Sequence, residues 1–150
     1  MSVDTISVET MQLAAAVILG MHGVGHILGL FPILGFTLTE EHSAHSWLLT
    51  PILGSFLAKL FLFLLFLAAT LGFVGSAMAL FNWQIAFALW QLLAMGGAAI
   101  SLVALLLFPR AFPTLIPNVV GAVIVDAAIL MALLWLRWPS ALLDLNMKVL

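Results

Sequence analysis

The chain has 150 residues, of which 65% are hydrophobic and 7% are charged, and its mean hydropathy is +1.31. A water-soluble domain of this length leaves roughly a third of its unfolded surface in water, and so few charged side chains cannot cover it. The net charge of -2, with scattered cations, excludes a nucleic-acid-binding face. The absence of cysteine excludes disulfides and iron–sulfur clusters. The composition therefore indicates an integral membrane protein.

Four apolar stretches are long enough to cross a hydrocarbon core of about 30 Å as helices. They cover approximately residues 11–36, 51–80, 84–108 and 114–136. We therefore predict an all-α fold: a single transmembrane domain over residues 1–150, built as an integral membrane four-helix bundle. Residues 137–150 are more polar, and we expect them to form a short tail along the membrane interface.

The first predicted span carries two histidines in its middle, His22 and His26. Four residues separate them, so they share one face of a helix. Gly25 and Gly29 lie on the same face, where small residues permit close helix approach. Two interpretations follow. The imidazoles either hydrogen-bond to neighbouring helices as part of the packing, or they belong to a site, because ionisable groups inside a membrane often mark one.

The second and fourth spans each hold one charged residue, Lys59 and Asp126. An ammonium at this depth costs roughly 3 kcal/mol, which predicts Asp126 as its counter-ion. Such a pair either specifies which helices pack together or contributes to a site.

Counting along the helices places these groups at similar depths in the membrane. At ~1.5 Å per residue from the face that carries the first and third loops, the histidines, Lys59 and Asp126 lie about 12 to 21 Å deep. Asn118 and Ser101 lie nearer that face, roughly 6 to 10 Å deep. We therefore predict one polar ligand-binding layer, in a cavity open toward these loops, formed by His22, His26, Lys59, Asp126, Asn118 and Ser101.

Several ligands suit such a layer. A metal ion would take His22, His26 and Asp126 as ligands, although an ammonium beside it would oppose binding. A haem would use one histidine only, since two histidines one turn apart cannot occupy opposite axial positions. A quinone or another amphiphile needs only one or two hydrogen-bonding groups in an apolar cleft. His42 and His45 in the first loop are further candidate ligands or simply solvated.

The segment Met21-His22-Gly23-Val24-Gly25-His26-Ile27-Leu28-Gly29 resembles the HGxGH-type first helix of some small bacterial four-helix membrane proteins. More distantly, it looks like the DoxX-like group. The resemblance covers about one helix and the number of spans, and it transfers no catalytic residue. Because some DoxX-like proteins are associated with quinone-linked redox complexes, it implies a quinone-linked role and a bacterial inner-membrane location.

Basic residues indicate the orientation of the chain. Arg137 and Lys148 fall on the side that holds both predicted termini, against Arg110 alone on the other. This distribution favours cytoplasmic termini.

The leading functional prediction is a protein that binds an amphiphilic or redox-active ligand, such as a quinone, at the polar layer. Its expected partners are membrane lipid and, in a homodimer or a larger membrane complex, other protein chains. The alternatives are a proton-coupled transporter or ion-conducting protein, a structural subunit without ligand, and an intramembrane zinc hydrolase.

Overall fold

The computed structural model of this chain describes residues 3–81, 85 and 87–138. The chain is helical throughout these residues apart from its connecting loops. The helical elements in chain order are α1 (Val3–Gly25), η1 (His26–Leu34), α2 (Leu49–Leu80), η2 (Phe87–Leu89), α3 (Trp90–Leu107), η3 (Leu115–Val119), α4 (Val120–Leu130) and η4 (Met131–Trp135). The 3-10 helix η1 prolongs α1, and the π-helical segments η3 and η4 flank α4.

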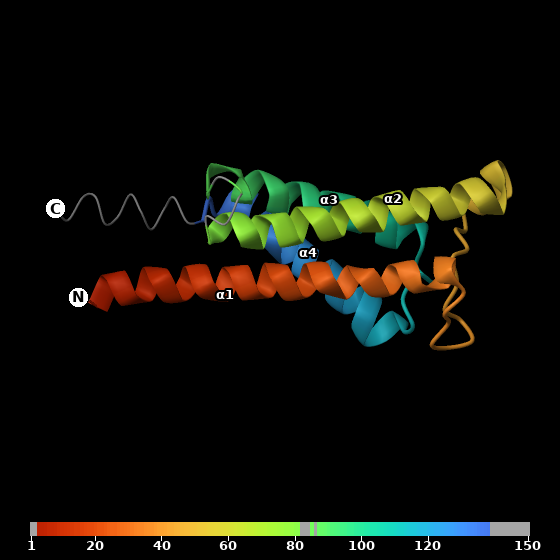
Figure 1. Cartoon of the computed structure of the whole chain (residues 1–150), viewed down its shortest axis with the longest axis horizontal. Coiled ribbons are helices and arrows are strands. Elements are labelled where there is room, and N and C mark those ends of the chain that lie inside the picture. Colours follow the sequence, from red (N-terminus) through yellow and green to blue (C-terminus); the bar gives the residue numbers. More distant parts are fainter. Residues whose placement is uncertain (1–2, 82–84, 86, 139–150) are drawn as a thin grey trace.

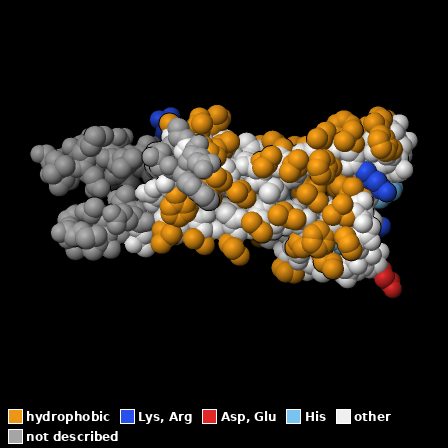
Figure 2. All heavy atoms as spheres, in the orientation of Figure 1, with side chains coloured by type: hydrophobic (Ala, Val, Ile, Leu, Met, Phe, Trp, Pro, Cys, Tyr) orange, Lys and Arg blue, Asp and Glu red, His pale blue; other side chains and the backbone are white. Residues whose placement is uncertain are grey.

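Among the described residues, four helical segments are long and apolar enough to cross a membrane: Thr10–Leu34, Leu49–Leu80, Trp90–Leu107 and Leu115–Trp135. They pack side by side as a bundle, so the predicted fold class is confirmed (Figure 1). The third span begins at Trp90 rather than at residue 84. On the face drawn in Figure 2, apolar side chains cover the sides of the bundle and charged ones lie at its ends. This distribution suits a protein surrounded by lipid.

The helices follow one another around the bundle in chain order. α1 packs on α2, α2 on α3, and α3 on α4. The contact between α2 and α3 is close at Gly72, where an added Cβ would lie 2.9 Å from the Cα of Gly97. Small residues at this crossing therefore let the two backbones meet, as is common between membrane helices.

Two glycines explain the ends of helical segments near the first loop. Gly35 ends η1 with φ of 83°, and the next amide donates to the Phe31 carbonyl over 3.0 Å. This left-handed cap satisfies carbonyls that the helix would otherwise leave open. Gly54, with φ of 79° and ψ of 169°, bends α2 after its first turn. Both angles suit a residue without a Cβ.

The loops 35–48 and 108–114 meet at one end of the bundle, and the starts of α1 and α3 lie at the other (Figure 1). The Ser43 amide donates to the Arg110 carbonyl over 2.8 Å, and the Thr39 hydroxyl donates to Pro113 over 2.7 Å. His42 is buried between these loops. Its Nε2 donates to the Ala111 carbonyl over 2.8 Å. His42 therefore fastens the two loops together.

The predicted interfacial tail, residues 137–150, lies outside the described residues except for Arg137 and Trp138. The predicted break between the second and third spans is likewise described only in part, because residues 82–84 and 86 fall outside.

Candidate functional site: a buried polar cluster and an apolar cleft

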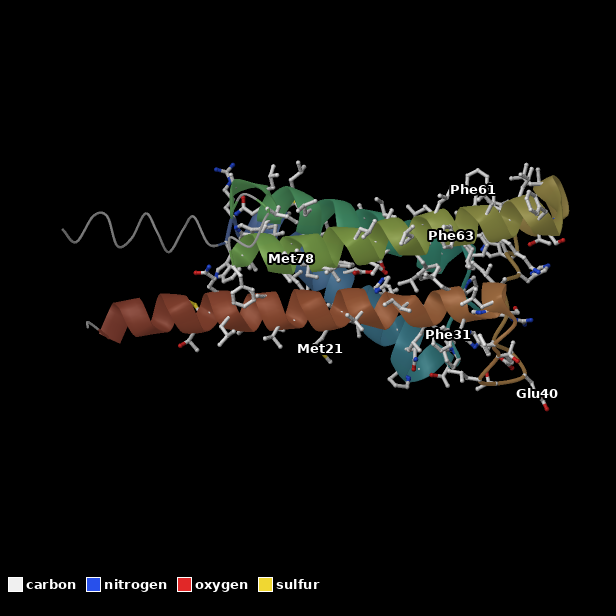
Figure 3. The ribbon with its side chains drawn as sticks, in the orientation of Figure 1. Met21, Phe31, Glu40, Phe61, Phe63 and Met78 are labelled. Atoms are coloured by element: carbon white, nitrogen blue, oxygen red, sulfur yellow. The ribbon has the colours of Figure 1, made fainter. Side chains whose placement is uncertain are left out.

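The two histidines of the first span face the interior of the bundle. Met21, their neighbour, points away from it and is 70% exposed, whereas His26 is 1% exposed (Figure 3). Glycines on the same helix bring α2 close to the imidazoles. A Cβ at Gly23 would lie 2.8 Å from the Cβ of Phe73, and one at Gly29 would lie 2.8 Å from the Phe66 ring. The predicted inward face is therefore confirmed for the histidines and Gly29. It is wrong for Gly25, where an added Cβ would meet nothing within 4 Å, and Gly23 makes the close approach instead.

Four side chains from three of the four spans form a polar cluster, which we define as His22, His26, Ser101 and Asp126. His22 Nε2 lies 2.8 Å from Asp126 Oδ1. The Ser101 hydroxyl lies 2.5 Å from Asp126 Oδ2 and 2.5 Å from His26 Nε2. His26 Nδ1 donates to the His22 backbone carbonyl over 2.9 Å. The cluster thus joins α1 and η1 to α3 and α4 through a continuous chain of hydrogen bonds.

The number of hydrogens in this chain follows from its donors and acceptors. His26 Nδ1 carries a hydrogen, because a carbonyl oxygen only accepts. The two contacts of Ser101 need one hydrogen each, and its hydroxyl supplies only one. The other therefore sits on His26 Nε2 or on Asp126 Oδ2. Either an imidazolium faces a carboxylate, or a neutral imidazole faces a carboxylic acid.

Both arrangements leave the polar cluster without net charge when His22 is neutral and donates from Nε2 to Asp126. An uncharged, fully hydrogen-bonded group costs far less to bury than an isolated ion. The burial of Asp126, which is 0% exposed, is thus explained without a lysine counter-ion.

Aromatic rings close the cluster on the side of α2 and the third loop. The His26 ring centroid lies 5.9 Å from that of Phe66, 5.5 Å from Phe73 and 6.0 Å from Phe112. The cavity at the loop end is lined by none of the cluster residues, so the predicted opening toward the loops is not found among the described residues.

The predicted ion pair between Lys59 and Asp126 is also wrong. Both oxygens of Asp126 are bonded within the polar cluster, and Lys59 is exposed. Lys59 instead lines a cavity of about 300 Å³ at the loop end with Pro32, Thr37, His42, Ser43, Ala44, His45, Thr50 and Ser55. Counting residues placed Lys59 too deep in the membrane, because the first loop reaches the level of Lys59 and lines the same cavity. The long side chain of Lys59 also allows its ammonium to reach the polar loop end.

The other two predicted layer residues have different roles. Ser101 was expected nearer the loop face as part of an approach to the layer, but it lies inside the cluster and joins His26 to Asp126. Asn118 lies in η3 and accepts a hydrogen bond from the Thr114 hydroxyl over 2.8 Å. It takes no part in the cluster, because its helix begins near the loop end of the bundle.

Three of the four cluster residues offer metal-binding atoms close together. One atom each from His22, His26 and Asp126 lies within 4.8 Å of the other two. The residues predicted as metal ligands are thus adjacent. A haem is not favoured, because the rings of Phe66, Phe73 and Phe112 pack against His26, where a macrocycle would need to lie.

An apolar cleft of about 480 Å³ lies beside the polar cluster, in the half of the bundle opposite the loops. Its walls come from α1, α3, α4 and η4. Ile18 in this wall precedes His22 by one helical turn, and Val125 directly precedes Asp126. The full lining is Met11, Ala14, Ala15, Ile18, Leu19, Trp90, Ala94, Ile124, Val125, Ala128, Ile129, Ala132, Leu133 and Trp138. The sequence does not reveal this cleft, because apolar residues that line a groove have the same pattern as residues that face lipid.

Comparisons with models of known families, with curated proteins and with solved structures found no match for this chain. The resemblance of the first span to DoxX-like proteins therefore stays a prediction.

Proposed function

We propose that this protein binds an amphiphilic molecule from the lipid phase, with its apolar chain in the cleft and its polar head at His22. The observation that carries this proposal is the position of the cleft, which ends one helical turn from a buried polar cluster. Its volume of about 480 Å³ falls within the usual range for small-ligand sites.

His22 supplies the atom that would hold the head group. Its Nε2 is bonded to Asp126, which leaves Nδ1 as its second hydrogen-bonding atom, and the side chain is 11% exposed. In the tautomer that donates to Asp126, Nδ1 is an acceptor. It therefore suits a hydroxyl head, such as that of a quinol, and the apolar walls suit a prenyl chain.

Filling the cleft tests this function. Ala128 lines the cleft, whereas its neighbour Ala127 is exposed on the same helix and is not part of the lining. We expect Ala128→Trp to weaken photolabelling by a diazirine-bearing prenylated quinol at least about tenfold, since overfilling a site commonly costs more than ~1.4 kcal/mol. Ala127→Trp is the matched control and should label like the wild type.

The same experiment can refute the proposal in two ways. Equal labelling of both tryptophan variants would show that the quinol does not occupy the cleft. A phospholipid probe of the same chain length could also label the wild type as strongly as the quinol does and lose this labelling in Ala128→Trp. That result would mean that bulk lipid fills the cleft.

Proton transfer is the second candidate function. It is favoured by the hydrogen bonds that link Asp126 through Ser101 to His26, because one hydrogen in this series can lie on either Asp126 or His26. Conduction across the membrane ranks lower, because among the described residues this series meets the Phe66, Phe73 and Phe112 rings toward the loops. On the other side it meets the apolar cleft. Proton transfer confined to the cluster therefore predicts no proton flux in sealed vesicles that contain the protein.

A further inference from the structure

The geometry of the polar cluster points to a second ligand: we infer that His22, His26 and Asp126 form a site for one divalent first-row transition-metal ion. Two imidazole nitrogens and one carboxylate oxygen are a ligand set that such ions favour, and one that leaves positions open for a further ligand. Mg²⁺ and Ca²⁺ prefer oxygen ligands alone. The inference shares His22 with the proposed head-group contact, but it does not depend on the cleft, since none of the three ligands lines it.

The distances between the ligand atoms are close to those a metal ion requires. His22 Nε2 and Asp126 Oδ1 are 2.8 Å apart, and the atoms of all three residues lie within 4.8 Å. Ligand atoms around a four-coordinate ion lie roughly 3.3 Å apart, as follows from metal–nitrogen bonds of about 2.0 Å. Binding therefore requires the three ligand atoms to draw together from separations of up to 4.8 Å, with His26 Nε2 giving up its hydrogen bond to Ser101.

The hydrogen bonds around His26 already orient it as a ligand. Its Nδ1 donates to the His22 backbone carbonyl over 2.9 Å, which directs Nε2 into the cluster. Metal-binding histidines commonly hold their second nitrogen in this way. Coordination needs both Nε2 atoms without hydrogen. His22 would therefore carry its hydrogen on Nδ1, and the hydrogen shared through Ser101 would leave as a proton.

Access to the cluster comes through His22. Its side chain is 11% exposed, whereas Asp126 and Ser101 are 0% exposed. An ion, or a ligand that completes its coordination, would therefore approach from the side of α1 and α4. Thr70 shares a face of α2 with Phe66 and Phe73, whose rings contact His26. Its buried hydroxyl has no hydrogen-bond partner among the described residues, so it is available to a bound water.

Asp126→Asn and Ser101→Ala separate metal binding from helix packing. The amide introduced by Asp126→Asn would keep every hydrogen bond of the neutral arrangement: its oxygen accepts from His22, and its nitrogen donates to Ser101, which donates to His26. This variant keeps the packing and loses the anionic ligand. Ser101→Ala does the opposite, because it breaks the hydrogen-bonded chain but keeps all three ligands.

The test is a Co²⁺ titration of protein purified in detergent without a polyhistidine tag, followed by visible d–d absorption and by metal analysis. The wild type should bind one Co²⁺ per chain, with Mg²⁺ in excess failing to compete. Asp126→Asn should bind at least about 100-fold more weakly, since loss of supporting groups alone costs up to that factor. Ser101→Ala should stay within about tenfold of the wild type. His45→Gln, which removes an exposed histidine of the loop, should have no effect.

Three results would overturn the inference. The wild type could fail to give a saturable d–d band. Asp126→Asn could bind as tightly as the wild type while circular dichroism shows both folded. Equal loss of binding in Ser101→Ala and Asp126→Asn would also reject this ligand set. Failure of the amphiphile proposal would look different, because it is read from Ala128→Trp with a quinol probe and no metal.

Discussion

Asp126 is the residue on which the polar cluster depends, because both its oxygens join helices together. Oδ1 is bonded to His22 on α1, and Oδ2 to Ser101 on α3. A buried donor that loses its acceptor costs about 1 to 3 kcal/mol. The chemistry of this side chain, and not its volume alone, should therefore determine stability.

Replacing Asp126 should distinguish these contributions. We expect Asp126→Leu to lower the free energy of unfolding by about 1 to 3 kcal/mol, because His22 loses its acceptor. Asp126→Asn should change it by less than about 1 kcal/mol, because an amide can keep both bonds. Unfolding in mixed micelles of dodecylmaltoside and dodecyl sulfate measures the free energy of unfolding of each variant. A larger loss in the asparagine variant than in the leucine variant would contradict the hydrogen-bond assignment.

Among the elements, the close crossing of α2 and α3 is the contact most sensitive to volume. Gly72 faces Gly97 at this crossing, with 2.9 Å between a built Cβ and the opposite Cα. The backbone of Gly97 cannot move aside as a flexible side chain can. A larger side chain at position 72 must therefore push the two helices apart.

Gly72→Ala should therefore destabilise the bundle by about 1 to 3 kcal/mol, despite the better helix propensity of alanine. Gly96→Ala is the matched control on α3, because a Cβ there meets nothing within 4 Å. We expect the control to be neutral or slightly stabilising. Thermal unfolding in detergent, read by circular dichroism, compares the two. Equal effects in both variants would mean that α2 and α3 do not cross at Gly72.

At the scale of the whole molecule, the fold places two loops at one end of the bundle. Glu40 lies in the first loop (Figure 3), and Thr114 precedes η3. Phe81 caps α2 at the other end, where the Gln12 side chain donates to the Leu80 carbonyl. These positions lie at opposite ends of the bundle, and the cytoplasmic termini predicted from the sequence put Glu40 outside.

Cysteine labelling should verify this topology, since the natural chain has no cysteine. Glu40→Cys and Thr114→Cys should react with a membrane-impermeant maleimide from outside the cell. Phe81→Cys should react only after the membrane is opened. The unmodified chain gives the background. Labelling of Glu40→Cys and Thr114→Cys from opposite sides would refute the bundle, whereas reversal of all three would refute only the predicted orientation.

Much of the fold follows from composition and hydrophobic length. Lipid is the only solvent that suits this composition, and each predicted span is long enough to cross it. The spacing of His22 and His26 also indicated a shared inward face, because helical periodicity is a local property. The central part of the candidate site could therefore be predicted without knowing how the helices pack.

Only the tertiary structure decided which polar groups meet. Lys59 and Asp126 have opposite charges and similar depths by residue counting, yet Lys59 lies at the loop end and Asp126 bonds to His22 and Ser101. Depth along a helix follows from counting residues, but the direction of a side chain around the helix depends on its neighbours. The cleft arises for the same reason: its walls come from separate helices, whose arrangement no single apolar stretch encodes.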